Sequence, residues 1–340
     1  MSDDVLTQVL AGSAAAVFQT TLLQPFEFVK TAAQLRRGIP GIKQQVAIQP
    51  VKTYFVGASV LNIGAVLKTG ARFGTFEQVC QLIAPPQDTQ QAQPVANNSF
   101  ASMQLAPWQV ALAGIITGCV ESVWIIPFEN VKTRMIENAM YWGDRRDGEV
   151  KPTAPKASPS ASPTFHKATP QDLHPRYKAF LEYEKKPSVG MLNTVVEVYR
   201  TRGIPGFLQG SMPTILRQIG NSMVRFTVYT TLKKRLTDPG QPTSEAVAFA
   251  LGAASSLAVV ATTQPLDVVK TRMMSKNAWR EYTNALNCCY QIFITEGWVS
   301  LYKGAVPRLL KVGLSGGISF GIYQYVENMI SQARHDGYLR

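Results

Sequence analysis

The sequence contains few of the residues on which most enzymes rely. Its 340 residues include only three histidines and four cysteines. The cysteines have neither the spacing of zinc ligands nor that of a redox pair. No nucleophile elbow, phosphate-binding glycine loop or dinucleotide fingerprint occurs in the chain. We therefore expect a protein that is not an enzyme and that uses no metal or cofactor.

Charged residues are also scarce, and their signs are unbalanced. They make up 16% of the sequence, compared with about 25% in typical soluble domains. The 34 Lys and Arg outnumber the 22 Asp and Glu, which gives a formal net charge of +12 at pH 7. So few charges argue against a disordered chain. The positive excess suits a partner that is a nucleic acid, an anionic membrane or an anionic small molecule.

Long uncharged runs favour the membrane class. Residues 5–26 and 246–266 carry no formal charge, and Glu121 is the only charge within 99–128. Each run has the roughly 20 residues that a helix needs to cross a bilayer. Further apolar stretches that contain interior charges cover 54–80, 207–233 and 301–330. The sequence therefore predicts an all-α membrane protein with six transmembrane helices.

A motif repeats three times along the chain. A proline is followed two residues later by an acid and five residues later by a lysine. The three copies are Pro25, Glu27 and Lys30; Pro127, Glu129 and Lys132; and Pro265, Asp267 and Lys270. One glycine follows each copy at a corresponding place, and we call these three the anchor glycines: Gly57, Gly210 and Gly304. The chain therefore divides into a first repeat at 1–83, a second at 107–236 and a third at 237–332.

Two segments interrupt these repeats. Residues 84–106 form a linker rich in Gln and Pro, and 143–187 contains seven prolines. The distance from motif proline to anchor glycine is 83 residues in the second repeat and 39 in the third. We expect 143–187 to be a disordered insertion.

The residue types in the motif have a physical reading. A proline within a helix removes one backbone hydrogen bond and kinks the helix, here at Pro25, Pro127 and Pro265. An acid and a lysine three residues apart lie on the same helix face. Three such faces around one axis are able to close a ring of ion pairs.

The threefold signature resembles that of the mitochondrial carrier family. The resemblance implies three helix–loop–helix repeats about a pseudo-threefold axis, with short matrix-side helices at 188–200, at 283–296 and, shortened, within 38–52. It also implies a matrix gate in which Glu27 pairs with Lys132, Glu129 with Lys270 and Asp267 with Lys30, and in which Gln34 braces the ring. On the cytoplasmic side only Glu77 and Lys233 match the family's second gate, so closure there should be weaker.

The even-numbered helices carry the residues expected to select a substrate. Positions 7, 11 and 15 after each anchor glycine lie on one helix face. These positions are Gly64, Lys68 and Arg72; Arg217, Asn221 and Arg225; and Lys311, Ser315 and Ser319. The face holds five cations and no acid. A charge in mid-membrane costs about 2.5–3.5 kcal/mol, so it usually faces water or a partner.

Arginine's planar fork suits a carboxylate or a phosphate. Strings around Lys68, Arg225 and Asp267 resemble the tricarboxylate (citrate) branch of the family, in which Gln218 would join the basic residues in binding carboxylates. The predicted function is therefore antiport of citrate or a related tri- or dicarboxylate by alternating access. Two alternatives stay open: a carrier for oxoglutarate, a dicarboxylate or a phosphorylated metabolite, and a carrier fold that serves only for docking.

The same pattern predicts location and partners. Basic loops after the motifs should face the matrix, so both termini should point toward the intermembrane space of the mitochondrial inner membrane. We expect a monomer that binds membrane lipid, with cardiolipin at the matrix-side helix ends, and that binds no nucleic acid.

Overall fold

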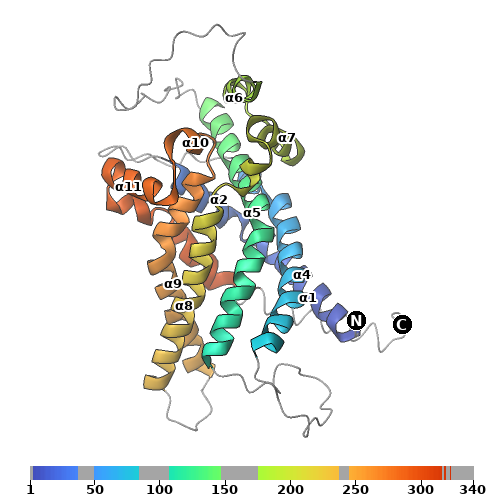
Figure 1. Cartoon of the computed structure of the whole chain (residues 1–340), viewed down its shortest axis with the longest axis vertical. Helices are drawn as coiled ribbons and strands as arrows, with labels where there is room; N and C mark the ends of the chain where they lie inside the picture. Colours follow the sequence, from blue (N-terminus) through green and yellow to red (C-terminus); the bar gives the residue numbers. More distant parts are fainter. Residues whose placement is uncertain are drawn as a thin grey trace.

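The computed structural model describes residues 3–36, 50–83, 107–146, 175–236 and 245–315, with 318 and 322. Every regular element in these residues is helical (Figure 1). The long helices are α1 (Asp3–Leu22), α2 (Gln24–Leu35), α4 (Ala58–Ile83), α5 (Pro107–Arg146), α8 (Ser211–Leu236) and α9 (Glu245–Met273), and residues 305–315 form another helical stretch. The predicted all-α class is confirmed.

Short helices connect the long ones. They are α3 (Val51–Tyr54), α6 (Pro175–Lys185), α7 (Met191–Arg202), α10 (Ala278–Glu281) and α11 (Ala285–Glu296), with 3-10 turns η1 (Ile204–Leu208) and η2 (Trp298–Tyr302). The bounds of α7 and α11 differ by no more than three residues from those of the short helices predicted at 188–200 and 283–296. α6, α7, α10 and α11 gather at one end of the bundle (Figure 1), which we call the motif end.

The long helices pack in a closed order. α4 packs between α1 and α5, and α8 packs between α5 and α9. The 305–315 stretch completes the circuit. Its Arg308 donates to Gln264 Oε1 of α9 at 3.0 Å, and its Lys311 Nζ lies 2.7 Å from Glu27 Oε2 of α2. The helices therefore surround a common centre.

The three motif prolines act differently from one another. α1 ends at Leu22 and α2 begins at Gln24, so the helix is interrupted just before Pro25. Pro127 and Pro265 lie inside the continuous helices α5 and α9. A proline lacks the N–H that would bond to the preceding turn, and a helix either tolerates that loss or breaks there.

Within each repeat, a carboxamide ties the motif helix to the start of the next long helix. Gln24 Nε2 donates to Val56 O at 2.7 Å, and Gln264 Nε2 donates to Lys303 O at 2.8 Å. In the second repeat Asn130 Nδ2 donates to Gln209 O at 2.9 Å. In all three cases the acceptor precedes the anchor glycine, so the tie fixes each anchor against its own motif.

Each anchor glycine also packs against the motif lysine of another repeat. A Cβ on Gly57 would lie 3.2 Å from Lys132 Cγ, and a Cβ on Gly304 would lie 3.0 Å from Lys30 O. A Cβ on Gly210 would lie 3.4 Å from Lys270 O. The three glycines have φ angles of +87°, +77° and +77°. A left-handed backbone and close contact across repeats both favour glycine here.

The expectation of disorder across 143–187 is wrong at both ends of that range. α5 continues to Arg146, and α6 occupies Pro175–Lys185. α6 forms because Phe180 is buried, with 2% of its surface exposed, against aromatic residues that include Trp279. The rest of the insertion, the linker 84–106 and most of 38–52 lie outside the described residues.

One helical stretch in the described part of the chain, Leu112–Trp142, is long and apolar enough to cross a membrane. A single stretch of this kind is weak evidence, so the six predicted spans stay a prediction here.

We expect Gly304→Ala to destabilise the protein by about 1–3 kcal/mol, because alanine disfavours a positive φ and its Cβ would press on the Lys30 carbonyl. Gly313→Ala is the control, since Gly313 is exposed and a Cβ there meets nothing within 4 Å. Thermal unfolding in detergent measures both variants. Equal stability of the two would contradict the packing described.

Candidate functional site

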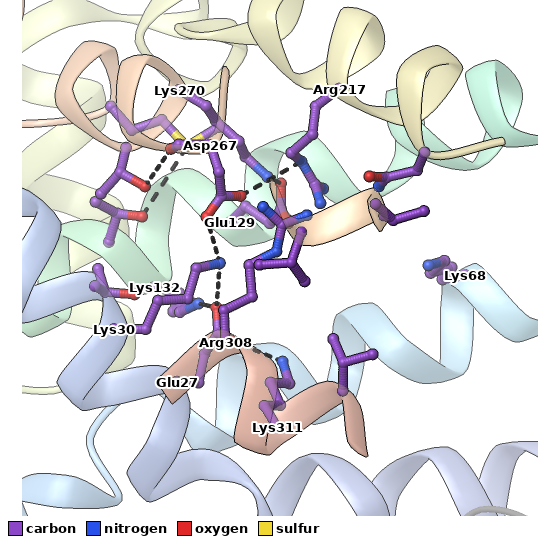
Figure 2. Close-up of a pocket in the computed structure, with 18 of the residues that line it drawn as sticks. Glu27, Lys30, Lys68, Glu129, Lys132, Arg217, Asp267, Lys270, Arg308 and Lys311 are labelled. Carbon is purple, nitrogen blue, oxygen red and sulfur yellow. Dashed lines mark hydrogen bonds and ion pairs between the residues drawn. The ribbon is translucent and has the colours of Figure 1, made fainter. Parts of the chain in front are cut away.

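A cavity of about 280 Å³ lies at the centre of the helices (Figure 2). Eight Lys and Arg side chains and three carboxylates line it. The cations are Lys30, Lys68, Lys132, Arg217, Arg225, Lys270, Arg308 and Lys311, and the acids are Glu27, Glu129 and Asp267. The lining therefore has a large positive excess.

Three ion pairs join the motif residues of different repeats. Lys132 contacts Glu27, Lys270 contacts Glu129, and Lys30 Nζ lies 2.6 Å from Asp267 Oδ2. These are the three pairs that the family resemblance implies. Figure 2 shows the paired side chains pointing toward one another among the residues that line the cavity. We call this set the ion-pair ring.

Gln34 forms hydrogen bonds with the ring. Its Nε2 donates to Asp267 Oδ2 at 2.8 Å, and its Oε1 accepts from Thr271 Oγ1 at 2.7 Å. It is fully buried. The equivalent residues in the other repeats, Ile136 and Met274, have no N–H to donate to a ring carboxylate, although Met274 Sδ accepts from Thr133 Oγ1 at 4.0 Å. Donation to a ring carboxylate from this position therefore occurs only at the Lys30–Asp267 pair among the described residues.

The predicted substrate cations are not free of acids, and that part of the sequence analysis is wrong. Lys311 Nζ lies 2.7 Å from Glu27 Oε2, and Arg217 Nε lies 3.6 Å from Asp267 Oδ1. Lys68, on α4, lies 3.5 Å from the buried Glu121 of α5. The error arose because the predicted face included the even-numbered helices alone, whereas α2, α5 and α9 supply the carboxylates.

Two predicted binding residues on α8 line the cavity without such a partner. Arg225 is exposed and forms no ion pair with the part of the chain that the structure describes. Asn221 has a buried Oδ1 that accepts no hydrogen bond within that part. Arg72 lies in α4, but its side chain is outside the description, as is Ser319.

Three other predicted contacts are not among the cavity-lining residues. A Cβ on Gly64 would lie 2.8 Å from Ile125 Cδ1, so this glycine permits close packing of α4 on α5. Gln218 packs against Gly118 of α5. Ser315 Oγ donates to the carbonyl of Val312 at 2.9 Å. Helical periodicity placed Gly64 and Ser315 on the predicted substrate face and the family resemblance added Gln218, but neither could show how closely the adjacent helices approach.

Arg308 is a cavity residue that the sequence analysis missed. It is 6% exposed and donates to Thr263 Oγ1 at 2.8 Å and to Gln264 Oε1 at 3.0 Å. It lies three residues before Lys311, which places the two on the same helix face. Extending the predicted face by one turn toward Gly304 would have found it.

The predicted cytoplasmic gate is not tested. Glu77 lies in α4 and Lys233 in α8, and the side chains of both are outside the description. Their pairing stays a prediction.

The fold and the cavity together define a class of protein. Helices enclose a positively charged central space, and ion pairs between different repeats close one side of it. Such a space suits a small anion that enters and leaves, which is the arrangement of a solute carrier.

The family model for the mitochondrial carrier protein matches residues 2–86, 174–240 and 242–334. The chain therefore belongs to the mitochondrial carrier family, whose members are transporters and not enzymes.

Relatives match along nearly the whole chain. An uncharacterized mitochondrial carrier of Saccharomyces cerevisiae is 40% identical over 97% of this chain and 97% of its own length. Mitochondrial citrate transporter A of Aspergillus niger is 32% identical over 94% and 90%. The tricarboxylate transport protein of Saccharomyces cerevisiae is 29% identical over 96% and 97%.

We expect Lys270→Met to destabilise the protein by about 3–5 kcal/mol, because it leaves Glu129 largely buried without its counter-charge. Adding Glu129→Gln should recover part of that loss, since no charge is then orphaned. Thermal unfolding of the two single variants and the double variant in detergent measures the coupling. Strictly additive losses would show that the pair does not interact.

Proposed function

We propose that the protein exchanges citrate, or a related tri- or dicarboxylate, across the mitochondrial inner membrane by alternating access. The observation that carries this proposal is the charge of the cavity lining, with eight cations and three acids. A positive excess in a partly buried space is unfavourable unless an anion joins it. Several carboxylates on one small molecule would supply the missing charge.

The size of the cavity and the relatives support the same substrate class. Its volume of about 280 Å³ is near the lower end of the range of roughly 300–1,000 Å³ for ligand pockets, which favours a small metabolite. Two of the relatives are a citrate transporter and a tricarboxylate transport protein.

The proposal includes six spans in three repeats. The first and third matched segments of the family model, 2–86 and 242–334, begin and end near the predicted repeat boundaries, and the second, 174–240, ends near one but begins inside the second repeat. In this arrangement the ion-pair ring faces the matrix, and the termini face the intermembrane space, because the loops beyond the motifs are the basic ones.

Binding and gating share residues in this site. Lys311 and Arg217 line the cavity and also contact Glu27 and Asp267 of the ring. A substrate carboxylate would compete with those ring carboxylates for the same cations. An anion that binds the open state better than the closed one shifts the population toward opening.

Liposomes that contain the purified protein and unlabelled citrate test the substrate class. We expect uptake of labelled citrate by exchange, and comparison with malate, oxoglutarate and phosphoenolpyruvate ranks the anions. Preference for a substrate other than citrate would assign the protein to another anion. Absence of exchange with every polyanion would contradict transport and favour the docking alternative.

Arg225→Gln tests the binding site with little risk to the fold, because Arg225 is exposed in the cavity and leaves no carboxylate unpaired. A charge-assisted hydrogen bond contributes about 1.5–3 kcal/mol, so the apparent affinity for citrate should fall by roughly ten- to a hundredfold. Arg200→Gln, on the exposed face of α7, is the matched control. Unchanged affinity in Arg225→Gln would remove Arg225 from the site.

A further inference from the structure

α6 belongs to the second repeat and packs against α10, which belongs to the third. Phe180 of α6 packs edge-to-face on Trp279 of α10, with ring centroids 5.7 Å apart. Arg280 of α10 places its guanidinium 5.8 Å from the Phe180 ring centroid and 5.9 Å from that of Tyr177. α6 precedes α7, whereas α10 follows α9. The contact therefore joins the two repeats at the motif end.

Lys276, just before α10, makes polar contacts across the same junction. Its Nζ lies 3.0 Å from Glu197 Oε1 of α7 and donates to Tyr183 O of α6 at 2.6 Å. Its backbone N–H donates to Glu137 Oε2 of α5 at 2.7 Å. Lys276 is only 8% exposed, and all three of these partners belong to the second repeat.

Glu197, the acid that pairs with Lys276, is held in place by hydrogen bonds. Glu197 is 2% exposed and accepts hydrogen bonds from Asn138 Nδ2 at 3.0 Å and from the Ser188 N–H at 3.2 Å. Burial alone would raise the pKa of Glu197, but the Lys276 charge and the hydrogen bonds hold it below its ordinary value. The carboxylate therefore stays charged and fixed as an acceptor.

Arg202 is a second cation at this junction, and here the donor belongs to the second repeat and the acceptors to the third. Arg202, at the end of α7, donates through Nη2 to the backbone carbonyls of Lys276 and Ser275. The chain around Lys276 is thus held from α5, α6 and α7 at once.

The junction between the first and second repeats is different in the described residues. There, beyond the Glu27–Lys132 pair, Phe28, Ala32 and Ile136 form a buried apolar cluster. Apolar contacts are non-directional and tolerate sliding better than a set of aimed hydrogen bonds. The two junctions therefore resist separation to different degrees.

We propose that α6 and the Lys276 contacts form a clamp that keeps the second and third repeats together at the motif end, so that the ion-pair ring opens first where the first repeat meets the second. The clamp rests on the proposed transport function. Lys276 follows Lys270 by six residues, and the chain between them stays hydrogen-bonded through Met274 N to Lys270 O at 3.0 Å. Parting Lys270 from Glu129 therefore strains the Lys276 contacts too.

Hydrogen exchange on the full-length protein in detergent, without substrate, tests the clamp independently of transport. In Lys276→Met we expect amide exchange to accelerate by roughly threefold or more in the last turns of α9 and in the facing turns of α5, with α2 unchanged. Lys178→Met, an exposed lysine on α6, is the matched control and should leave all three regions unchanged. Acceleration confined to α6 and α10, or equal acceleration in α2, would overturn the clamp.

A second variant guards against a folding defect in the first. Phe180→Ala weakens the aromatic contact and leaves Lys276 and Glu197 in place, and it should give the same exchange pattern. In liposomes that exchange citrate, both variants should also raise the saturating exchange rate by roughly threefold. A rate equal to or below that of the wild-type protein would overturn a role in gating. If the wild-type protein exchanges no polyanion, the transport proposal fails, while the hydrogen-exchange result still decides whether the clamp exists.

Discussion

A buried charge must be paired, and this constraint organises the centre of the molecule. Glu27, Lys132, Asp267 and Lys270 are each less than 9% exposed. Because the two partners of each ring pair belong to different repeats, pairing them brings all three repeats together. The anchor glycines favour this convergence, since a Cβ at each of them would lie only 3.0–3.4 Å from a motif lysine. Removing one partner of a buried pair costs about 3–5 kcal/mol, so the ring is a strong closure while it is complete.

The ring and the cavity are one electrostatic unit. Glu27 lies near three cations, Lys132 and Lys30 from the ring and Lys311 from the cavity wall. A carboxylate shared in this way cannot lose one partner without strengthening its attraction to the others. An incoming anion would therefore rearrange the ring even if it contacted Lys311 alone. This sharing would make a gate sensitive to the charge of its cargo.

The sequence predicted best what it repeats. A motif present three times indicated that a ring of ion pairs is able to close around one centre, and the family resemblance implied which residues pair. It predicted less well where a contact depends on the neighbouring helix: Gly64 and Gln218 were expected to contact the substrate, but both positions pack closely against α5. α6 was missed because a composition rich in proline and serine hides one short helix. The partner that buries Phe180 is distant in the sequence, and no local pattern indicates it.

The departures from threefold symmetry fit an asymmetric cargo. Among the described residues, the cavity cations outside the ring come mainly from α8 and from 305–315, in the second and third repeats. The first repeat contributes Lys68, which Glu121 already neutralises in part. The proposed clamp holds together the same two repeats that carry most of the binding charge. A site built this way would stay assembled around its anion while the first and second repeats separate, so binding and release would not require the site itself to come apart.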